Sequence, residues 1–75
     1  MKRQPIQAVE LVSIGYSVDE HILEVEFKDG SIYEIYDISI ELYEFMMNEG
    51  NFRYEYFKEH IMKEYLCRQI YPATH

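Results

Sequence analysis

Two runs of alternating apolar and polar residues meet at Asp29-Gly30 in the segment Ile22-Leu-Glu-Val-Glu-Phe-Lys-Asp-Gly-Ser-Ile-Tyr-Glu-Ile-Tyr-Asp-Ile38. Alternation with a period of two is typical of a strand with one buried face, and Asp-Gly is a strong signal for a two-residue hairpin loop. The segment therefore predicts a β-hairpin in which Lys28 lies opposite Ser31.

This register sorts the side chains of the hairpin into two faces, because neighbouring residues of a strand point to opposite sides. We expect the core face to contain Leu23, Val25, Phe27, Ile32, Glu34, Tyr36 and Ile38. We expect the other face to carry Glu24, Glu26, Lys28, Tyr33, Ile35 and Asp37. Tyr33 and Ile35 are then candidate binding residues on an exposed sheet face, unless the C-terminal segment covers them.

The flanking sequence predicts one strand before the hairpin and two helices after it. Residues 8–16 alternate loosely and suit a first strand. Ser39 is typical of a helix N-cap and Gly50 of a C-terminal stop, which predicts a helix over about 40–49. A second apolar period predicts a helix over about 53–64, while residues 65–71 fit a helix, a strand or coil. The fold class is therefore α+β: a three-stranded antiparallel β-meander followed by two α-helices packed on the sheet.

Length and composition fit a single small domain over residues 1–75 with an ordered core of about 8–71. The chain has one cysteine, Cys67, so an intrachain disulfide cannot form, and the spacing of cysteine and histidine does not suggest structural zinc. We find neither an export signal nor a membrane-spanning apolar run. We therefore expect a cytoplasmic protein without a membrane partner.

The net charge of −7 is concentrated in residues 19–49, which hold ten carboxylates against Lys28 alone. Non-specific nucleic-acid binding depends on lysine and arginine displacing counterions, so this acidic part disfavours it. The last third of the chain is the region that could contact phosphate, through Arg53, Lys58 and Arg68.

The first predicted helix has a narrow polar stripe, so apolar side chains cover most of its circumference. Phe45, Met46 and Met47 lie in this over-wide apolar region. Methionines at such positions are either core filler or adaptable contacts with another chain. We therefore treat these three residues as a candidate interaction surface, including one for self-association.

The polar residues do not form a catalytic constellation. His60 and Glu64 are at helical spacing and Cys67 follows, but zinc needs three or four converging ligands and a reactive thiol needs an electropositive setting. Carboxylate pairs such as Glu24 with Glu26 fit solvated positions better than a catalytic dyad. We expect no enzymatic activity, no metal and no small-molecule cofactor.

The order of these signals resembles the KTSC domain, a family found at the C-terminus of some lysyl-tRNA synthetases and in small stand-alone bacterial proteins. The residues that carry the resemblance are Ile14-Gly15-Tyr16, Leu23 to Phe27, Asp29-Gly30, Ile32-Tyr33, Tyr36-Asp37-Ile38, Tyr43, Tyr56-Phe57, Ile61 and Tyr65. The central Tyr-x-Tyr signature of the family falls on Tyr33-Glu34-Ile35, with isoleucine in place of the second tyrosine. The resemblance implies a function that is not established, with RNA binding suggested.

Two functions follow from these observations. The first is a small non-enzymatic interaction module that binds a protein or associates with itself. The alternative is an RNA-associated accessory domain, in which the ring of Tyr33 stacks on bases and the C-terminal basic residues contact phosphate.

Overall fold

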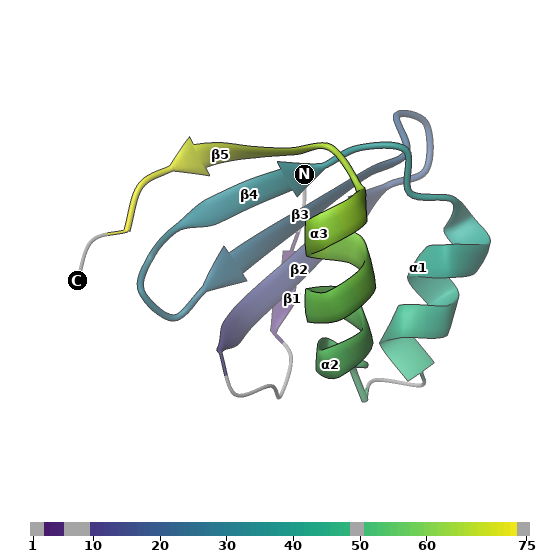
Figure 1. Ribbon diagram of the computed structural model, residues 1–75, viewed down its shortest axis with the longest axis horizontal. Coiled ribbons are helices and arrows are strands. Elements are labelled where there is room, and N and C mark those ends of the chain that lie inside the picture. Colours follow the sequence, from purple (N-terminus) through teal and green to yellow (C-terminus); the bar gives the residue numbers. More distant parts are fainter. Residues whose placement is uncertain (1–2, 6–9, 49–50, 74–75) are drawn as a thin grey trace.

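The structure is a computed structural model that describes residues 3–5, 10–48 and 51–73. In this part of the chain, an antiparallel sheet has its strands in sequence order, as Figure 1 shows. The strands are β1 (Arg3–Pro5), β2 (Leu11–Ser17), β3 (Ile22–Phe27), β4 (Ile32–Ile35) and β5 (Cys67–Tyr71). The predicted α+β class with an antiparallel sheet is confirmed. The three-stranded meander was incomplete, because β1 and β5 extend the sheet at its two edges.

Helix α1 (Ile40–Met47) begins where the sequence predicts. The Oγ of Ser39 accepts a hydrogen bond from the Leu42 N–H over 3.1 Å, which satisfies one of the free donors of the first turn. At the other end Asn48 is left-handed, with φ 38°, and its N–H donates to the Glu44 carbonyl. Asn48 therefore ends the helix, while the predicted stop at Gly50 lies outside the described residues.

The second helical segment consists of α2 (Tyr54–Tyr56), the π-helical turn η2 (Phe57–Ile61) and α3 (Met62–Glu64). The predicted helix over 53–64 is confirmed, although its period did not reveal the wider π turn. Phe57 and Ile61, four residues apart in η2, are 0% and 1% exposed. At Tyr65 the backbone becomes extended and leads into β5, so residues 67–71 form a strand.

One hydrophobic cluster joins strands and helical segments. Its buried members are Leu11, Ile14, Leu23, Val25, Ile35, Ile38, Met46, Phe52, Phe57 and Ile61. Tyr16 of β2 also packs against this cluster. Its ring stacks on that of Tyr43 in α1 at 4.5 Å between centroids, and its hydroxyl donates to the Ile38 carbonyl over 2.5 Å.

The predicted register of the hairpin is wrong by one residue. Leu23 pairs with Ile35 and Val25 with Tyr33, so three residues, 28–30, lie between Phe27 and Ser31. A shift of one residue moves a whole strand face to the other side of the sheet. The inward positions of Leu23 and Val25 are as predicted, whereas Tyr33 and Ile35 join them on the core face.

Glu34 and Tyr36 point to the opposite face of the sheet, away from the core to which the predicted register assigned them. Glu34 pairs with Glu24, and the Tyr36 hydroxyl donates to the Glu34 Oε1 over 2.9 Å. On the same face, the Ser13 hydroxyl donates to the Glu26 Oε1 over 2.9 Å. This face is therefore rich in carboxylates.

Candidate interaction surface

The predicted pair of exposed residues on the sheet, Tyr33 and Ile35, does not exist. Ile35 is fully buried in the core cluster. Tyr33 is half-buried, and its ring meets the edge of the Phe27 ring at 5.6 Å between centroids. Neither residue offers a bare ring on which a base could stack.

The candidate basic residues belong to separate environments. Lys58 lies in η2, where its Nζ is 3.8 Å from the Glu55 carboxylate and 5.9 Å from the centroid of the Tyr54 ring. Arg68 lies on β5, in register with Glu34. Arg53 precedes α2 and contacts α1 instead.

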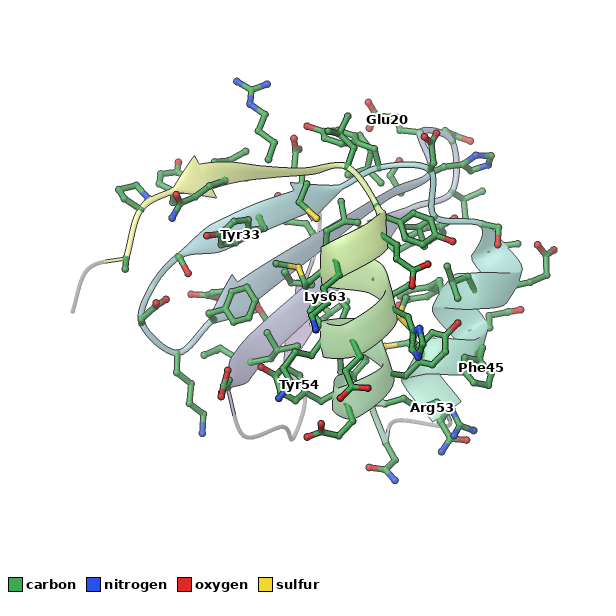
Figure 2. The ribbon with its side chains drawn as sticks, viewed as in Figure 1. Glu20, Tyr33, Phe45, Arg53, Tyr54 and Lys63 are labelled. Carbon is green, nitrogen blue, oxygen red and sulfur yellow. The ribbon has the colours of Figure 1, made fainter. Side chains whose placement is uncertain are left out.

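Arg53 and Phe45 contact each other at the surface in two ways, through the Phe45 ring and through the Phe45 carbonyl. Phe45 is 46% exposed although it is a large aromatic residue. The guanidinium carbon of Arg53 lies 4.4 Å from the centroid of the Phe45 ring, and the Arg53 Nε donates to the Phe45 carbonyl over 2.8 Å. Figure 2 shows the two side chains together at the outer side of α1. This geometry is a cation–π pair in which a hydrogen bond fixes the cation.

Two further rings extend this pair along the second helical segment. The edge of the Tyr56 ring meets Phe45 at 5.0 Å between centroids and an interplanar angle of 72°. The centroid of the His60 ring, four residues later, lies 4.7 Å from the centroid of the Tyr56 ring. We refer to Phe45, Arg53, Tyr56 and His60 as the Phe45 strip.

Backbone contacts hold the strip in place. The Arg53 N–H donates to the Met46 carbonyl over 2.8 Å, which ties the start of the second helical segment to the last turn of α1. The Phe57 N–H donates to the Arg53 carbonyl over 3.0 Å. Because Met46 and Phe57 are both fully buried, the strip rests on the core and is largely preformed.

Three exposed carboxylates lie close to the strip in sequence, one of them in contact with His60. Glu41 lies one turn before Phe45 and Glu59 lies three residues after Tyr56, and both are exposed. Glu64 holds the His60 Nδ1 at 3.5 Å from its Oε2. The strip is thus an aromatic surface with one arginine, and acidic residues stand at neighbouring positions of both helical segments.

The candidate surface residues of α1 divide between surface and core. Phe45 is exposed, Met47 is half-buried, and Met46 is fully buried in the core cluster. Of the two roles considered for Met46, core filler and contact residue, its full burial supports core filler. The sequence analysis considered His60 only together with Glu64 and Cys67 and assigned no surface role to Tyr56, although the spacing of four residues between Tyr56 and His60 places them on one helix face.

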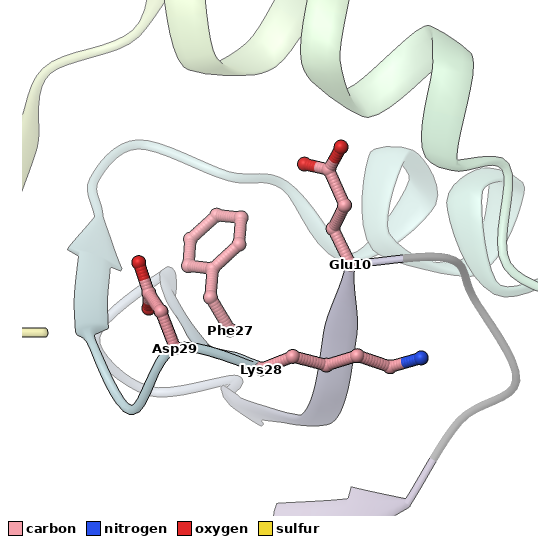
Figure 3. Close-up of a pocket in the computed structure, with 4 residues that line it drawn as sticks. All are labelled: Glu10, Phe27, Lys28 and Asp29. Carbon is pink, nitrogen blue, oxygen red and sulfur yellow. The ribbon is translucent and has the colours of Figure 1, made fainter. Parts of the chain in front are cut away.

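A shallow hollow lies where the residue before β2 meets the end of β3 and the loop that follows β3. Figure 3 shows it between Glu10, Phe27, Lys28 and Asp29, and its volume is about 270 Å³. The Tyr54 hydroxyl donates to the Glu10 Oε2 over 2.5 Å. Burial, together with the hydrogen bond to Glu10, raises the pKa of Tyr54 to about 12.

The described residues include no group of three or more histidine, cysteine, aspartate or glutamate side chains that could hold a metal ion. Burial raises the pKa of the Cys67 thiol, and the thiol donates to the Tyr65 carbonyl over 3.2 Å. A raised pKa keeps sulfur in the less nucleophilic thiol form. Among the helices described, none is both long and apolar enough to span a membrane.

The elements follow one another as a meander, two helical segments and a returning edge strand. This arrangement defines a small α+β domain with an antiparallel sheet. The KTSC domain profile matches residues 8–65, and the chain belongs to the KTSC domain family. The crystal structure of a KTSC domain protein from Yersinia pestis superimposes with a TM-score of 0.80 at 28% identity, and the match covers 93% of this chain and 97% of that one.

A curated relative adds sequence similarity over a shorter range. An uncharacterized protein of Stutzerimonas stutzeri (strain A1501) is 48% identical over 33 residues, which is 44% of this chain and 46% of that protein. The match thus spans about half of the relative's length.

Proposed function

We propose that this KTSC domain is a non-enzymatic protein-interaction module that binds a basic, partly apolar segment of a partner protein through the Phe45 strip. The observation that carries the proposal is the exposed Phe45 ring fixed under Arg53 and beside Tyr56. Aromatic residues and arginine dominate the binding energy of protein interfaces.

The charge of the surroundings supports a basic partner. Glu41, Glu59 and Glu64 stand at exposed positions next to the strip in sequence, Glu64 contacts His60, and the whole chain carries a net charge of −7. Complementary charge at the rim of an interface steers encounter and suppresses wrong partners. Lysine or arginine flanking an apolar anchor in the partner would meet these carboxylates, whereas a second Phe45 strip would bring like charges together.

The RNA alternative has weaker support. Tyr33 is half-buried, and the basic residues assigned to phosphate contact lie on separate elements. Arg53 and the exposed rings of Phe45 and His60 could stack on bases, but the neighbouring carboxylates repel phosphate. A protein partner therefore fits the strip better than RNA does. We place the protein in a reducing compartment such as the cytoplasm, which its single cysteine supports.

Peptide selection followed by NMR tests the proposal. Short peptides displayed on phage are selected against the domain, and we expect enrichment of lysine or arginine beside an aromatic or aliphatic anchor. Titration of the selected peptide into labelled domain is expected to shift the amides of Phe45, Arg53, Tyr56 and His60. Phe45→Ala and Arg53→Ala are expected to weaken binding by at least about tenfold, as truncation of a central interface residue does.

The control is Val18→Ala, at an exposed apolar residue between β2 and β3 that lies outside the strip. We expect it to leave binding unchanged. The same titration is repeated with short single-stranded RNA at low salt. Shifts at the strip with RNA and none with any selected basic peptide would overturn the proposal in favour of an RNA-associated domain.

A further inference from the structure

We infer that Asp29-Gly30 is a site of covalent self-modification, at which Asp29 isomerises to isoaspartate when the hairpin of β3 and β4 opens and is protected while the hairpin is closed. Asp29 is exposed in the loop that follows Phe27 (Figure 3). The next residue is glycine, so no Cβ hinders attack by its backbone nitrogen. The site contains no residue of the Phe45 strip, so the inference does not depend on the proposed function.

The reaction needs no reactant other than water. The Gly30 nitrogen loses its proton and attacks the side-chain carboxyl carbon of Asp29, so that a C–N bond forms, a carboxyl oxygen leaves as water and a cyclic imide results. Water then opens the imide. Addition at the side-chain carbonyl restores aspartate, whereas addition at the main-chain carbonyl breaks the original peptide bond. The chain then runs through the side chain of residue 29, with an additional methylene in its backbone.

The closed loop engages the attacking nitrogen. The Gly30 N–H donates a hydrogen bond to the Phe27 carbonyl over 3.0 Å, and Gly30 has a φ of 93°. The nitrogen must give up this proton before it can attack, so the reaction breaks the hydrogen bond. The Phe27 N–H in turn donates to the Ser31 carbonyl over 2.9 Å, which holds the two ends of the loop together.

The closed loop also engages the carboxylate. The Asp29 Oδ1 accepts hydrogen bonds from the Ser31 N–H over 2.9 Å and from the Ser31 hydroxyl over 2.6 Å. Ser31 is only 4% exposed, so water has little access to these donors. Hydrogen bonds to a charged acceptor are roughly twice as strong as neutral ones, and the reaction consumes that charge. Both reacting groups are therefore held until the hairpin opens.

The product no longer fits the loop. An additional methylene lengthens the connection between Phe27 and Ser31, and the carboxylate is attached at a different backbone position. The contacts that close the hairpin are then lost, together with the register that places Ile35 in the core. Isomerisation of Asp29 therefore converts a transient opening of the hairpin into a lasting one.

Incubation at neutral pH tests the protection by the fold. The folded chain is compared with a synthetic peptide of residues 25–34, and a protease that cleaves after glutamate releases residues 27–34 for mass spectrometry with electron-transfer fragmentation. We expect isoaspartate to accumulate at least about tenfold more slowly in the folded chain, because the reaction waits for local opening. Equal rates in the folded chain and the peptide would overturn the inference.

Substitutions separate the roles of the two reacting groups. In the peptide, Gly30→Ala should slow isomerisation, because a Cβ hinders the nitrogen, and an unchanged rate would overturn the assignment to this dipeptide. In the folded chain, Ser31→Ala should raise the rate about fivefold, because the carboxylate loses a donor. The matched control is Lys28→Ala, which leaves the contacts of Asp29 with Ser31 and should not change the rate. A Ser31→Ala chain with a native circular dichroism spectrum and the wild-type rate would overturn the protective role of the loop.

Discussion

The backbone N–H of Phe27 donates a hydrogen bond to the Ser31 carbonyl over 2.9 Å, and this contact closes the hairpin around a three-residue loop. Inside the loop the Gly30 N–H donates back to the Phe27 carbonyl over 3.0 Å, and Gly30 has a φ of 93°. A type I turn followed by a left-handed glycine is the common three-residue hairpin connection.

The side chain of Asp29 explains why the loop has three residues. A two-residue Asp-Gly loop needs positive φ at both positions, and Asp29 is not among the described residues with positive φ. Its Oδ1 instead accepts hydrogen bonds from the Ser31 N–H over 2.9 Å and from the Ser31 hydroxyl over 2.6 Å. This aspartate turn stabilises the longer loop.

Gly30→Ala should destabilise the domain by about 1 to 2 kcal/mol, because a Cβ is unfavourable in the left-handed region. Urea denaturation followed by circular dichroism measures the change. The control is Lys28→Ala, at an exposed loop residue, which should alter the free energy of unfolding by less than about 0.5 kcal/mol. Equal effects of the two substitutions would contradict the left-handed role of Gly30.

The register makes a second prediction, at two adjacent residues of β4. Ile35→Ala should lower the free energy of unfolding by about 2 to 5 kcal/mol, because it removes a fully buried side chain. Since this loss is close to the whole stability of so small a domain, Ile35→Val provides a milder change of about 0.5 to 1.5 kcal/mol.

Glu34→Ala is the matched comparison on the opposite face of the same strand. It removes the acceptor of the Tyr36 hydroxyl and should cost about 1 kcal/mol or less. A larger loss for Glu34→Ala than for Ile35→Ala would restore the register of a two-residue loop. Chemical denaturation of the three variants decides between the registers.

Local signals in the sequence predicted the elements better than their pairing. Ser39 identifies the start of α1 because a side-chain cap acts within one turn of the chain. The face of β4 depends on a single residue in a loop, and both loop lengths are compatible with Asp-Gly. The strand character of residues 67–71 depends on the free edge of β4, which is a tertiary property and not a local one.

The residues of the candidate surface could be predicted from local signals, but the contacts between them could not. Phe45 was identified because apolar residues cover most of its helix, and Arg53 was identified by its charge. Their contact depends on the hydrogen bond between the Arg53 N–H and the Met46 carbonyl, which spans the connection between two helices. The period of the second helix did not reveal the π turn of η2, which follows Tyr56 and contains His60.

Ser39→Ala should destabilise the domain by about 1 kcal/mol, because the Leu42 N–H loses its acceptor at the start of α1. Ser39→Asp keeps an acceptor and places a negative charge at the positive end of the helix dipole, so it should retain or raise stability. Thermal unfolding of both variants distinguishes a capping role from a general sensitivity of this position. A loss of similar size in both would contradict the cap.

Stability at high pH should depend on Tyr54. Its pKa is raised from 10.0 to about 12, first by burial and then by the hydrogen bond to Glu10, so the folded state holds the phenolic proton more tightly than the unfolded state. This contribution is complete below pH 10.0 and is lost as the pH rises to about 12. Tyr54→Phe should cost about 1 kcal/mol at neutral pH and show a smaller loss of stability over that interval.

Urea denaturation of the wild type and Tyr54→Phe at a series of pH values measures this difference. Tyr71→Phe is the control, because it removes an exposed phenol and keeps the contact between Tyr54 and Glu10. If Tyr54→Phe and the wild type lose stability in parallel above pH 10.0, Tyr54 does not hold its proton in the way described.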